Sequence, residues 1–297
     1  MINYEDVVSM CDKYMSEHKK DVLCYPLNIY FSTLKELVPH VSYKFNNEKI
    51  SEIKKKIIEE TSKSNINKYH KYLLIYIINE NIYTLSALDI SDTVLSLYLY
   101  EFKRIISECS SNSDSFYDYS NDLFCKDLAI ATLQMFPAGV LKAEYLSGVP
   151  RRCMLSNRGM DIFKWYKLLR QVKNFYPYYE IHLDVRYREK FSPEGWDAAL
   201  RIVGDMLVLN PKIKGITGAS WFFDPQIATV TPRLKYLRMM IEEHGGYFFK
   251  YKKDAHTAML ATLRSKNRRN LYESGAYSPV SYFMVWPRKD VLSWLNN

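Results

Sequence analysis

The spacing of apolar residues changes near residue 150, and this change limits the folds open to the chain. In the first half, apolar residues recur at intervals of three and four, as in Val7, Met10, Cys11 and Tyr14, which is typical of amphipathic helices. In the second half, helical segments alternate with short runs that follow the two-residue period of a β-strand. We therefore predict a helical domain over residues 1–135 and a basic α/β domain over residues 136–297.

The first half divides into successive predicted helices. They include one opened by Pro26 that ends before Pro39, and others over 50–58, 69–78 and about 122–135. The polar residues 109–121 predict a loop before the last of these helices. Together these segments predict an N-terminal helical bundle.

The second half alternates predicted helices and strands. Helices are predicted over 161–172, 193–209, 231–244, 256–264, 267–274 and after Pro287, and strands over 178–187, 213–223, 247–251 and 280–286. The predicted fold class is α+β or α/β, with the helical bundle followed by a mixed sheet whose strand order is open.

Composition excludes several classes of protein. A chain of 297 residues that is 47% hydrophobic has enough apolar residues for a folded core. The longest apolar run, residues 72–78, is too short to cross a membrane, and the acidic N-terminus lacks a secretory signal. We expect a cytoplasmic protein with no membrane partner. Its five scattered cysteines predict reduced thiols, and only Cys153, beside Arg151 and Arg152, has a setting that favours a thiolate.

Charge is divided unevenly along the chain. Residues 1–148 hold 16 Lys+Arg against 20 Asp+Glu, whereas residues 149–297 hold 25 against 13, so the net charges are −4 and +12. Arg104 is the single arginine of the first part, and the other 13 follow residue 148. Because guanidinium groups bind phosphate and carboxylate bidentately, we expect the second half to bind an anion. A solvated basic surface is the alternative.

One face of the predicted strand 178–187 is the first candidate site. Glu180, His182, Asp184 and Arg186 would point to one side, with apolar residues on the other. A histidine between two carboxylates is suited to act as a general base, so His182 and Asp184 are candidate catalytic residues and Arg186 a candidate binding residue. The alternative is a solvated edge strand. No histidine spacing supports a metal, and we predict none.

The second candidate is the end of the predicted strand 213–223. Its glycines allow close approach of a backbone or ligand, and Ser220, Trp221 and Asp224 follow them at the place where α/β sheets bind ligands. We predict Ser220 and Asp224 as catalytic and Trp221 as substrate-binding. Alternatively, Trp221 and Phe223 belong to the core and Asp224 caps a turn.

The third candidate is a basic cluster in residues 256–269. Arg264, Arg268 and Arg269 crowd a predicted helix boundary and could hold a phosphate or carboxylate, although cations also gather there to complement a helix dipole. The glycine-rich loops of P-loop and dinucleotide-binding proteins are absent, as is the Arg/Gln-x-x-Gly-x-Gly/Ala loop of acetyl-CoA enzymes.

Four pieces of the second half occur in an order that resembles a known family. They are Gly148-Val-Pro150 with Asp161 and Trp165, His182 with Pro193-Glu194, Ser220 to Gln226 (Ser-Trp-Phe-Phe-Asp-Pro-Gln), and the helix from Thr257 towards Gly275. Over roughly residues 125–275 the chain resembles bacterial proteins with a GNAT-like N-acyltransferase C-terminal domain. In that family a long segment separates the tryptophan helix from the histidine strand, whereas here Trp165 and His182 are 17 positions apart.

The resemblance implies a GNAT-like α/β domain that transfers an acyl group to an amine. It further implies a small anionic substrate, acyl-CoA as co-substrate and no tightly bound cofactor. The shortened segment favours a different class, a non-catalytic module that binds an acidic protein or, less favoured, nucleic acid. A serine hydrolase using Ser220 with His182 is a third hypothesis, although Gly-x-Ser-x-Gly is absent. The oligomeric state, the acyl group and its acceptor are left open.

Overall fold

The computed structural model describes residues 3–19, 26–45, 47–60, 66–111, 117–150, 166 and 176–297. The predicted helix 161–172, together with Asp161, Trp165, Cys153 and the arginines at 151, 152 and 158, lies outside the described residues. The chain forms two compact units, residues 1–144 and 145–297. We predicted two domains that meet between residues 135 and 136, and this boundary stays a prediction.

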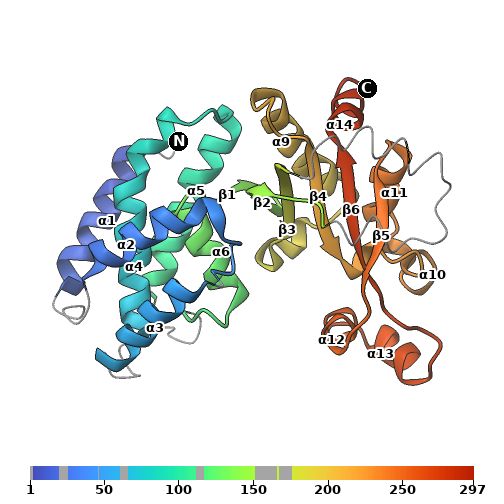
Figure 1. The fold of residues 1–297 in the computed structure, drawn as a ribbon, viewed down its shortest axis with the longest axis horizontal. Helices are drawn as coiled ribbons and strands as arrows, with labels where there is room; N and C mark the ends of the chain where they lie inside the picture. Colours follow the sequence, from blue (N-terminus) through green and yellow to red (C-terminus); the bar gives the residue numbers. More distant parts are fainter. Residues whose placement is uncertain are drawn as a thin grey trace. The chain divides into compact units, whose positions relative to one another are not determined.

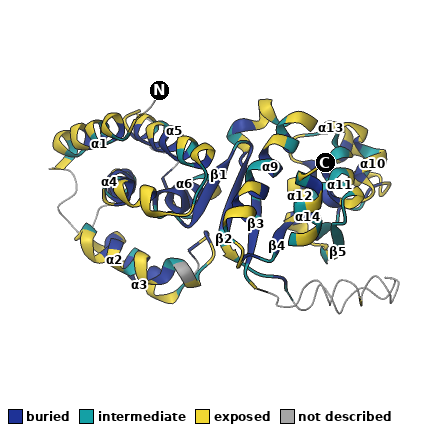
Figure 2. Ribbon diagram, turned by 90° about the horizontal axis from the view of Figure 1, so that it is seen from above, coloured by how far each residue is buried: buried dark blue, intermediate teal, exposed yellow. Residues whose placement is uncertain are grey.

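Unit 1 consists of helices followed by a β-hairpin. Its helices are α1 (Tyr4–His18), α2 (Leu27–Leu37), α3 (Glu48–Glu60), α4 (Ile66–Asn81), α5 (Asp92–Cys109) and α6 (Asp122–Ala131), with the short 3-10 helices η2 (Val38–His40) and η3 (Ile82–Ala87). Helix α4 is buried along most of its length, whereas α1 exposes one face, as Figure 2 shows. The three-and-four spacing of apolar residues predicted a helical bundle, and unit 1 forms such a bundle around α4.

The end of unit 1 differs from the prediction. The helix expected to reach residue 135 ends at Ala131, because Leu133 adopts the left-handed conformation with φ 60° and turns the chain. Strands β1 (Met135–Ala138) and β2 (Leu141–Ser147) then pair antiparallel. The run Met135–Ala138 shows no alternation of apolar and polar residues and contains a proline, so the sequence gives no strand signal there. Residues 141–145 do alternate, and this strand signal was missed.

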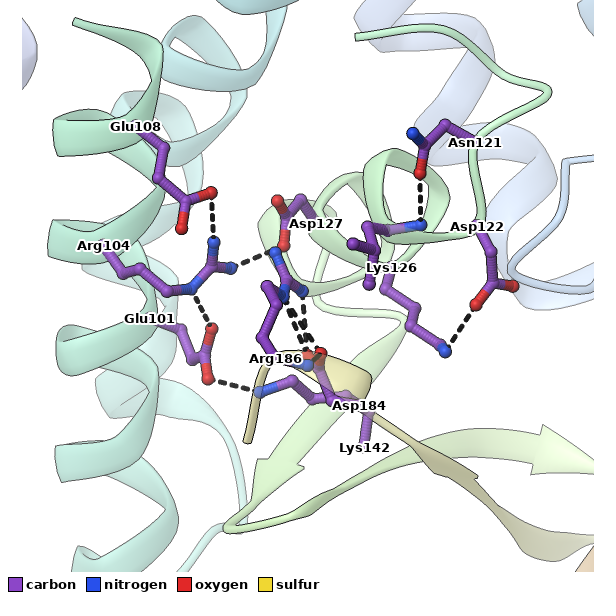
Figure 3. A network of polar contacts seen from close by, with 11 residues as sticks. Glu101, Arg104, Glu108, Asn121, Asp122, Lys126, Asp127, Lys142, Asp184 and Arg186 are labelled. Carbon is purple, nitrogen blue, oxygen red and sulfur yellow. Dashed lines mark hydrogen bonds and ion pairs between the residues drawn. The ribbon is translucent and has the colours of Figure 1, made fainter. Parts of the chain in front are cut away.

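A network of buried charges stabilises unit 1 (Figure 3). The Arg104 guanidinium donates to Glu101 Oε2 at 2.9 Å, to Glu108 Oε2 at 2.8 Å and to Asp127 Oδ1 at 2.5 Å. Lys142 pairs with the second oxygen of Glu101. Burial alone would lower the pKa of Arg104, but the carboxylates of Asp127 and Glu101 raise it well above its usual range. The single arginine of the first half is therefore the centre of an internal ion-pair network.

Unit 2 contains most of a mixed sheet with helices packed beside it (Figure 1). The strands are β3 (Tyr178–Leu183), β4 (Gly215–Ser220), β5 (Tyr247–Lys252) and β6 (Ser281–Pro287), and the helices are α9 (Pro193–Leu209), α10 (Ile227–Val230), α11 (Tyr236–Glu243), α12 (Ala255–Thr262), α13 (Lys266–Glu273) and α14 (Arg288–Leu295), with the 3-10 helices η4 (Val185–Lys190), η5 (Trp221–Phe223) and η6 (Pro232–Leu234). The strand order of the six-stranded sheet is β1-β2-β3-β4-β6-β5. This arrangement confirms the predicted fold class of N-terminal helices followed by a mixed sheet.

Two predicted strands are shorter in the structure. Strand β3 ends at Leu183, because the Asp184 side chain accepts a hydrogen bond from the Arg186 main-chain N–H and starts η4. Asp184 and Arg186 therefore do not share a strand face with His182, and that prediction was wrong. The edge-strand alternative was also wrong, since β3 lies inside the sheet order. Strand β4 likewise ends at Ser220, where η5 begins.

The core of unit 2 depends on close contact between β3 and β4. Both strands run parallel, with Tyr179 opposite Ile216 and Glu180 opposite Thr217. A Cβ atom added at Gly218 would lie 2.9 Å from Ile181 Cγ1, so this glycine lets the two strands approach. On its other side β4 pairs antiparallel with β6 over its whole length.

Within the described residues, no helix is long and apolar enough to cross a membrane.

The Arg104 network leads to a stability prediction. Replacing Arg104 with alanine would leave the buried Glu101 and Asp127 without their shared cation, which costs about 3–5 kcal/mol in the free energy of unfolding. Urea unfolding followed by circular dichroism measures this loss. Lys55→Ala is the matched control, because Lys55 pairs with Glu59 at the surface and should cost under about 1 kcal/mol. Equal losses in the two variants would contradict the network's role.

His70 should make the stability of unit 1 depend on pH. Burial lowers the pKa of His70 to about 4, and its Nδ1–H donates to the Tyr117 carbonyl at 2.7 Å. The unfolded state, in which histidine titrates near about 6.5, therefore binds more protons between these pH values. The free energy of unfolding should fall by about 3 kcal/mol as pH drops from 6.5 to 4. His70→Gln, which does not titrate, should show a smaller fall over the same range, and an equal fall would refute this assignment.

Candidate functional site

The candidate site lies at one edge of the unit 2 sheet. Because β3 and β4 are parallel, their carboxyl ends meet at this edge, where open α/β sheets usually bind ligands. Strand β6 runs antiparallel to β4 and brings Tyr282 opposite Ser220. We call His182, Ser220, Trp221 and Tyr282 the site edge.

The pairing between β3 and β4 stops before this edge is reached. The registered pairs are Tyr179–Ile216 and Glu180–Thr217, whereas β4 pairs with β6 as far as Ser220. Residues 218–220 of β4 therefore have no registered partner on β3, although Gly218 is in contact with Ile181.

His182 is half-buried near the end of β3. A nitrogen of its imidazole and a carboxylate oxygen of Glu180, two residues earlier, lie within 4.8 Å of each other. Glu180 in turn accepts a hydrogen bond from Ser147 Oγ at 2.5 Å. The structure thus places His182 with one of its predicted carboxylate neighbours.

Asp184 and Arg186 form an internal pair. The Asp184 carboxylate is fully buried and accepts from Arg186 Nε at 3.0 Å and from its terminal nitrogen at 2.8 Å, besides capping η4 (Figure 3). The Arg186 side chain is only 15% exposed. The pair orders the chain just after β3 and so helps to hold the end of the His182 strand.

Ser220 ends β4, and its side chain caps the next element. Ser220 Oγ accepts a hydrogen bond from the Phe222 main-chain N–H at 3.2 Å, which starts η5. In the part of the chain that the structure describes, this hydroxyl forms no hydrogen bond with His182. The Ser220 and His182 side chains therefore lie at the ends of adjacent strands without the contact that a hydrolase dyad uses.

The buried side chain of Asp224 stabilises the turn formed by Ser220–Gln226. Its carboxylate is 2% exposed and accepts main-chain N–H groups from Gln226 at 3.0 Å and Val280 at 2.9 Å. Asp224 therefore ties this turn to the segment that leads into β6. These contacts match the alternative in which Asp224 caps a turn.

The three predicted arginines of the basic cluster separate in the structure. Arg268 is 5% exposed and stacks over the Trp221 ring at 4.6 Å, while Arg268 Nε donates to the Ala261 carbonyl at 2.5 Å. Burial lowers the pKa of Arg268, and no carboxylate pairs with it among the described residues. Arg264 and Arg269 are exposed. The structure thus joins Arg268 to Trp221 and leaves the other two at the surface.

Arg238 and Tyr282 complete the surroundings of the site edge, and neither was predicted. The Arg238 guanidinium lies over the rings of Phe248 at 4.4 Å and Tyr282 at 5.5 Å and donates to the Phe223 carbonyl at 2.7 Å. Burial raises the pKa of Tyr282. The predicted strand 280–286 contains Tyr282, but only the strand order brings it beside Ser220.

An open hollow of about 620 Å³ lies on unit 1, away from these residues in the sequence. It is lined by surface side chains of α1, among them Asp12, Lys13 and Ser16, with Tyr83 at one side. Because this open groove brings no convergent catalytic groups together, the sheet edge of unit 2 remains the better candidate.

Comparison with known proteins gives one structural likeness. No family model and no curated protein matches the chain. A crystal structure of an acyltransferase in complex with decanoyl-CoA and teicoplanin is similar with a TM-score of 0.47 and 11% identity, over 74% of this chain and 66% of that chain. The match thus spans just under two thirds of that protein. At this identity and TM-score, the likeness assigns neither activity nor substrate to the chain.

The contacts of Asp224 predict a loss of stability on a minimal change. In Asp224→Asn, one of the two accepting oxygens becomes an NH2 group facing a main-chain N–H, which should cost about 1–3 kcal/mol. Urea unfolding of the variant measures the cost. Asp197→Asn removes a carboxylate from a partly exposed pair with Arg201 and should cost under about 1 kcal/mol. Unchanged stability of Asp224→Asn would show that these contacts do not hold the turn.

Proposed function

We propose that unit 2 transfers an acyl group from an anionic carrier, such as CoA, to an amine. The observation that carries this proposal is the parallel pair β3–β4, whose registered pairing ends before the edge where His182 and Ser220 lie. Two adjacent strand ends with incomplete main-chain pairing can receive an extended ligand. The resemblance of residues 125–275 to GNAT-like acyltransferases supports the same reaction.

His182 is the proposed general base. In the reaction the amine nitrogen attacks the thioester carbonyl, the new C–N bond forms, the C–S bond breaks, and the carrier leaves as a thiolate that takes up a proton. The amine must lose a proton, which the neutral imidazole of His182 accepts. A half-buried histidine near a strand end is held in a fixed position.

Ser220 and Trp221 are proposed to orient the substrate. The Ser220 hydroxyl already accepts a hydrogen bond from the Phe222 N–H, so its own proton is available to a substrate acceptor atom. Trp221 is held in place by Arg268, which stacks on its ring at 4.6 Å. These residues would form one wall beside the reacting atoms.

The two aspartates predicted as catalytic fit a positioning role better. Asp184 is fully buried with its carboxylate engaged by Arg186, and Asp224 is buried with both oxygens bound to main-chain N–H groups. A carboxylate used in this way would need to give up existing bonds before it could act as a base. We therefore propose that Asp184 and Asp224 hold the ends of β3 and β4 in place.

The anionic part of the carrier is proposed to meet the exposed arginines. Arg264 and Arg269 are exposed and can pair with phosphate. Arg186 and Arg268 have internal partners and little exposure, and so contribute less to this contact.

Titration calorimetry with CoA and acetyl-CoA tests the central premise. We expect binding in the micromolar to millimolar range, roughly 10⁻⁶ to 10⁻³ M, as for many enzyme substrates. Absence of any heat of binding at the upper end of this range would remove the carrier from the proposal.

His182→Ala tests the assigned base once a turnover assay with an amine acceptor is available. Loss of a general base lowers kcat by roughly 10²–10⁴-fold, while the thermal midpoint of unfolding should change little. His40→Ala, an exposed histidine of unit 1, is the matched control and should retain full activity. If His182→Ala unfolds, its role is structural, and the base must be sought elsewhere.

A second candidate function is a non-catalytic module that binds an anionic macromolecule. The observation in its favour is that Asp184, Arg186 and Asp224 all serve internal contacts. Binding to nucleic acid would weaken steeply as salt rises, and a flat response would exclude that form of the module. A serine hydrolase has less support, because Ser220 caps η5.

A further inference from the structure

Helix α12 exposes the apolar side of its sequence. Met259, Leu260 and Leu263 are 49%, 43% and 56% exposed, and their spacing places them on one face of the helix. The opposite, buried face carries only small residues, including Thr257 and Thr262. We call Met259, Leu260 and Leu263 the apolar ridge. A surface helix ordinarily turns such side chains inward, so this outward ridge indicates a contact with something outside the described chain.

Exposed cations lie close to the apolar ridge in the sequence. Lys253 precedes α12, Arg264 follows it, and Lys266 and Arg269 lie on α13, all exposed. We call these four residues the basic rim. Two carboxylates lie near them, Asp254 at the start of α12 and Glu273 at the end of α13. Positive charge thus exceeds negative charge around an apolar centre.

The ridge and rim lie at a projecting part of unit 2. Figure 1 shows α12 and α13 together beyond the ends of β5 and β6, apart from α9 and α14. Ser265 caps α13 directly after Arg264, so the turn between the two helices presents Leu263 and Arg264 next to each other. Arg268 anchors this helix pair from inside through Ala261 and Trp221. The projecting helices are therefore firmly attached to the sheet edge.

The chemistry of this surface favours a lipid bilayer over a macromolecular partner. A stable protein interface buries about 800 Å² on each side, far more than three half-exposed side chains offer. A nucleic acid would use the basic rim and could stack on the exposed ring of Tyr272 on α13, but it would leave the apolar ridge in water. An anionic bilayer uses both parts, because lipid phosphates attract the cations and the acyl region receives the apolar side chains.

We propose that the apolar ridge and basic rim of α12–α13 form a docking surface for an anionic lipid bilayer. From the sequence we predicted no membrane partner, since no segment can span a bilayer. Docking on the surface of a bilayer requires no spanning segment. The inference shares Arg264 and Arg269 with the carrier contact proposed above. Vesicle binding is measured without carrier or turnover, so its failure and the failure of acyl transfer are distinguishable.

Sedimentation of the full-length protein with lipid vesicles tests the docking. Vesicles of phosphatidylcholine with about 30% phosphatidylglycerol should bind it, whereas pure phosphatidylcholine vesicles should bind it weakly. Raising NaCl from about 0.05 to 0.5 M should release most of the bound protein, because salt screens the cations of the rim. Free inorganic phosphate at the same ionic strength should release no more than NaCl does.

Matched variants locate the contact. Leu263→Glu should lower the partition coefficient on anionic vesicles roughly tenfold, because it puts a carboxylate where an apolar side chain enters the lipid. Val208→Glu, which alters an equally exposed apolar residue on α9, should bind like the unmodified protein. Arg264→Ala combined with Lys266→Ala should also weaken binding, whereas Lys212→Ala, an exposed cation elsewhere in unit 2, should have little effect. All these positions are exposed, so circular dichroism should report an intact fold.

Several outcomes would overturn the proposal. They are the absence of binding to anionic vesicles, unchanged binding of Leu263→Glu, and an equal loss in Val208→Glu. Binding of duplex DNA or self-association that depends on Leu263, without vesicle binding, would assign the surface to another partner and would also reject the bilayer.

Discussion

The close approach of β3 to β4 is the contact on which unit 2 depends. Gly218 allows it, since a side chain at this position would collide with Ile181. Because the strands are parallel, their contact brings His182 and Ser220 to the same edge of the sheet. Strand β6 then pairs with the other side of β4 and adds Tyr282. The position of the candidate site edge thus follows from one packing requirement inside the sheet.

Buried charges stabilise the segments around this edge. Asp184 pairs with Arg186 after β3, and Asp224 binds two main-chain N–H groups after β4. Arg268 stacks on Trp221 and connects the turn to α12. Each group is costly to bury and is compensated by specific partners, which gives the loops at the site a defined geometry. The same residue types that suggested chemistry in the sequence therefore serve largely to position the remaining candidates.

Unit 1 uses the same principle for its own core. Arg104 joins three carboxylates from α5 and α6, and Lys142 completes the charge balance at Glu101 (Figure 3). Such networks depend on every member, because the removal of one leaves a buried charge uncompensated. The four cations of the basic rim differ from Arg104 in their position. They lie at the surface around an apolar ridge, where they remain available to an external anion.

The sequence by itself determined the helical first half, the α/β character of the second half, and the segments that contain the candidate residues. These follow from hydrophobic periodicity and caps, which are local properties of the chain. Only the tertiary structure decided that β3 lies inside the sheet, that Asp184 and Asp224 are buried, and that Arg268 points inward while Arg264 and Arg269 do not. Strand order and side-chain burial depend on contacts between residues far apart in the sequence, and local spacing carries no information about those contacts. For the same reason the sequence identified a basic cluster after residue 256, but its apolar ridge became evident only when the buried face of α12 was known.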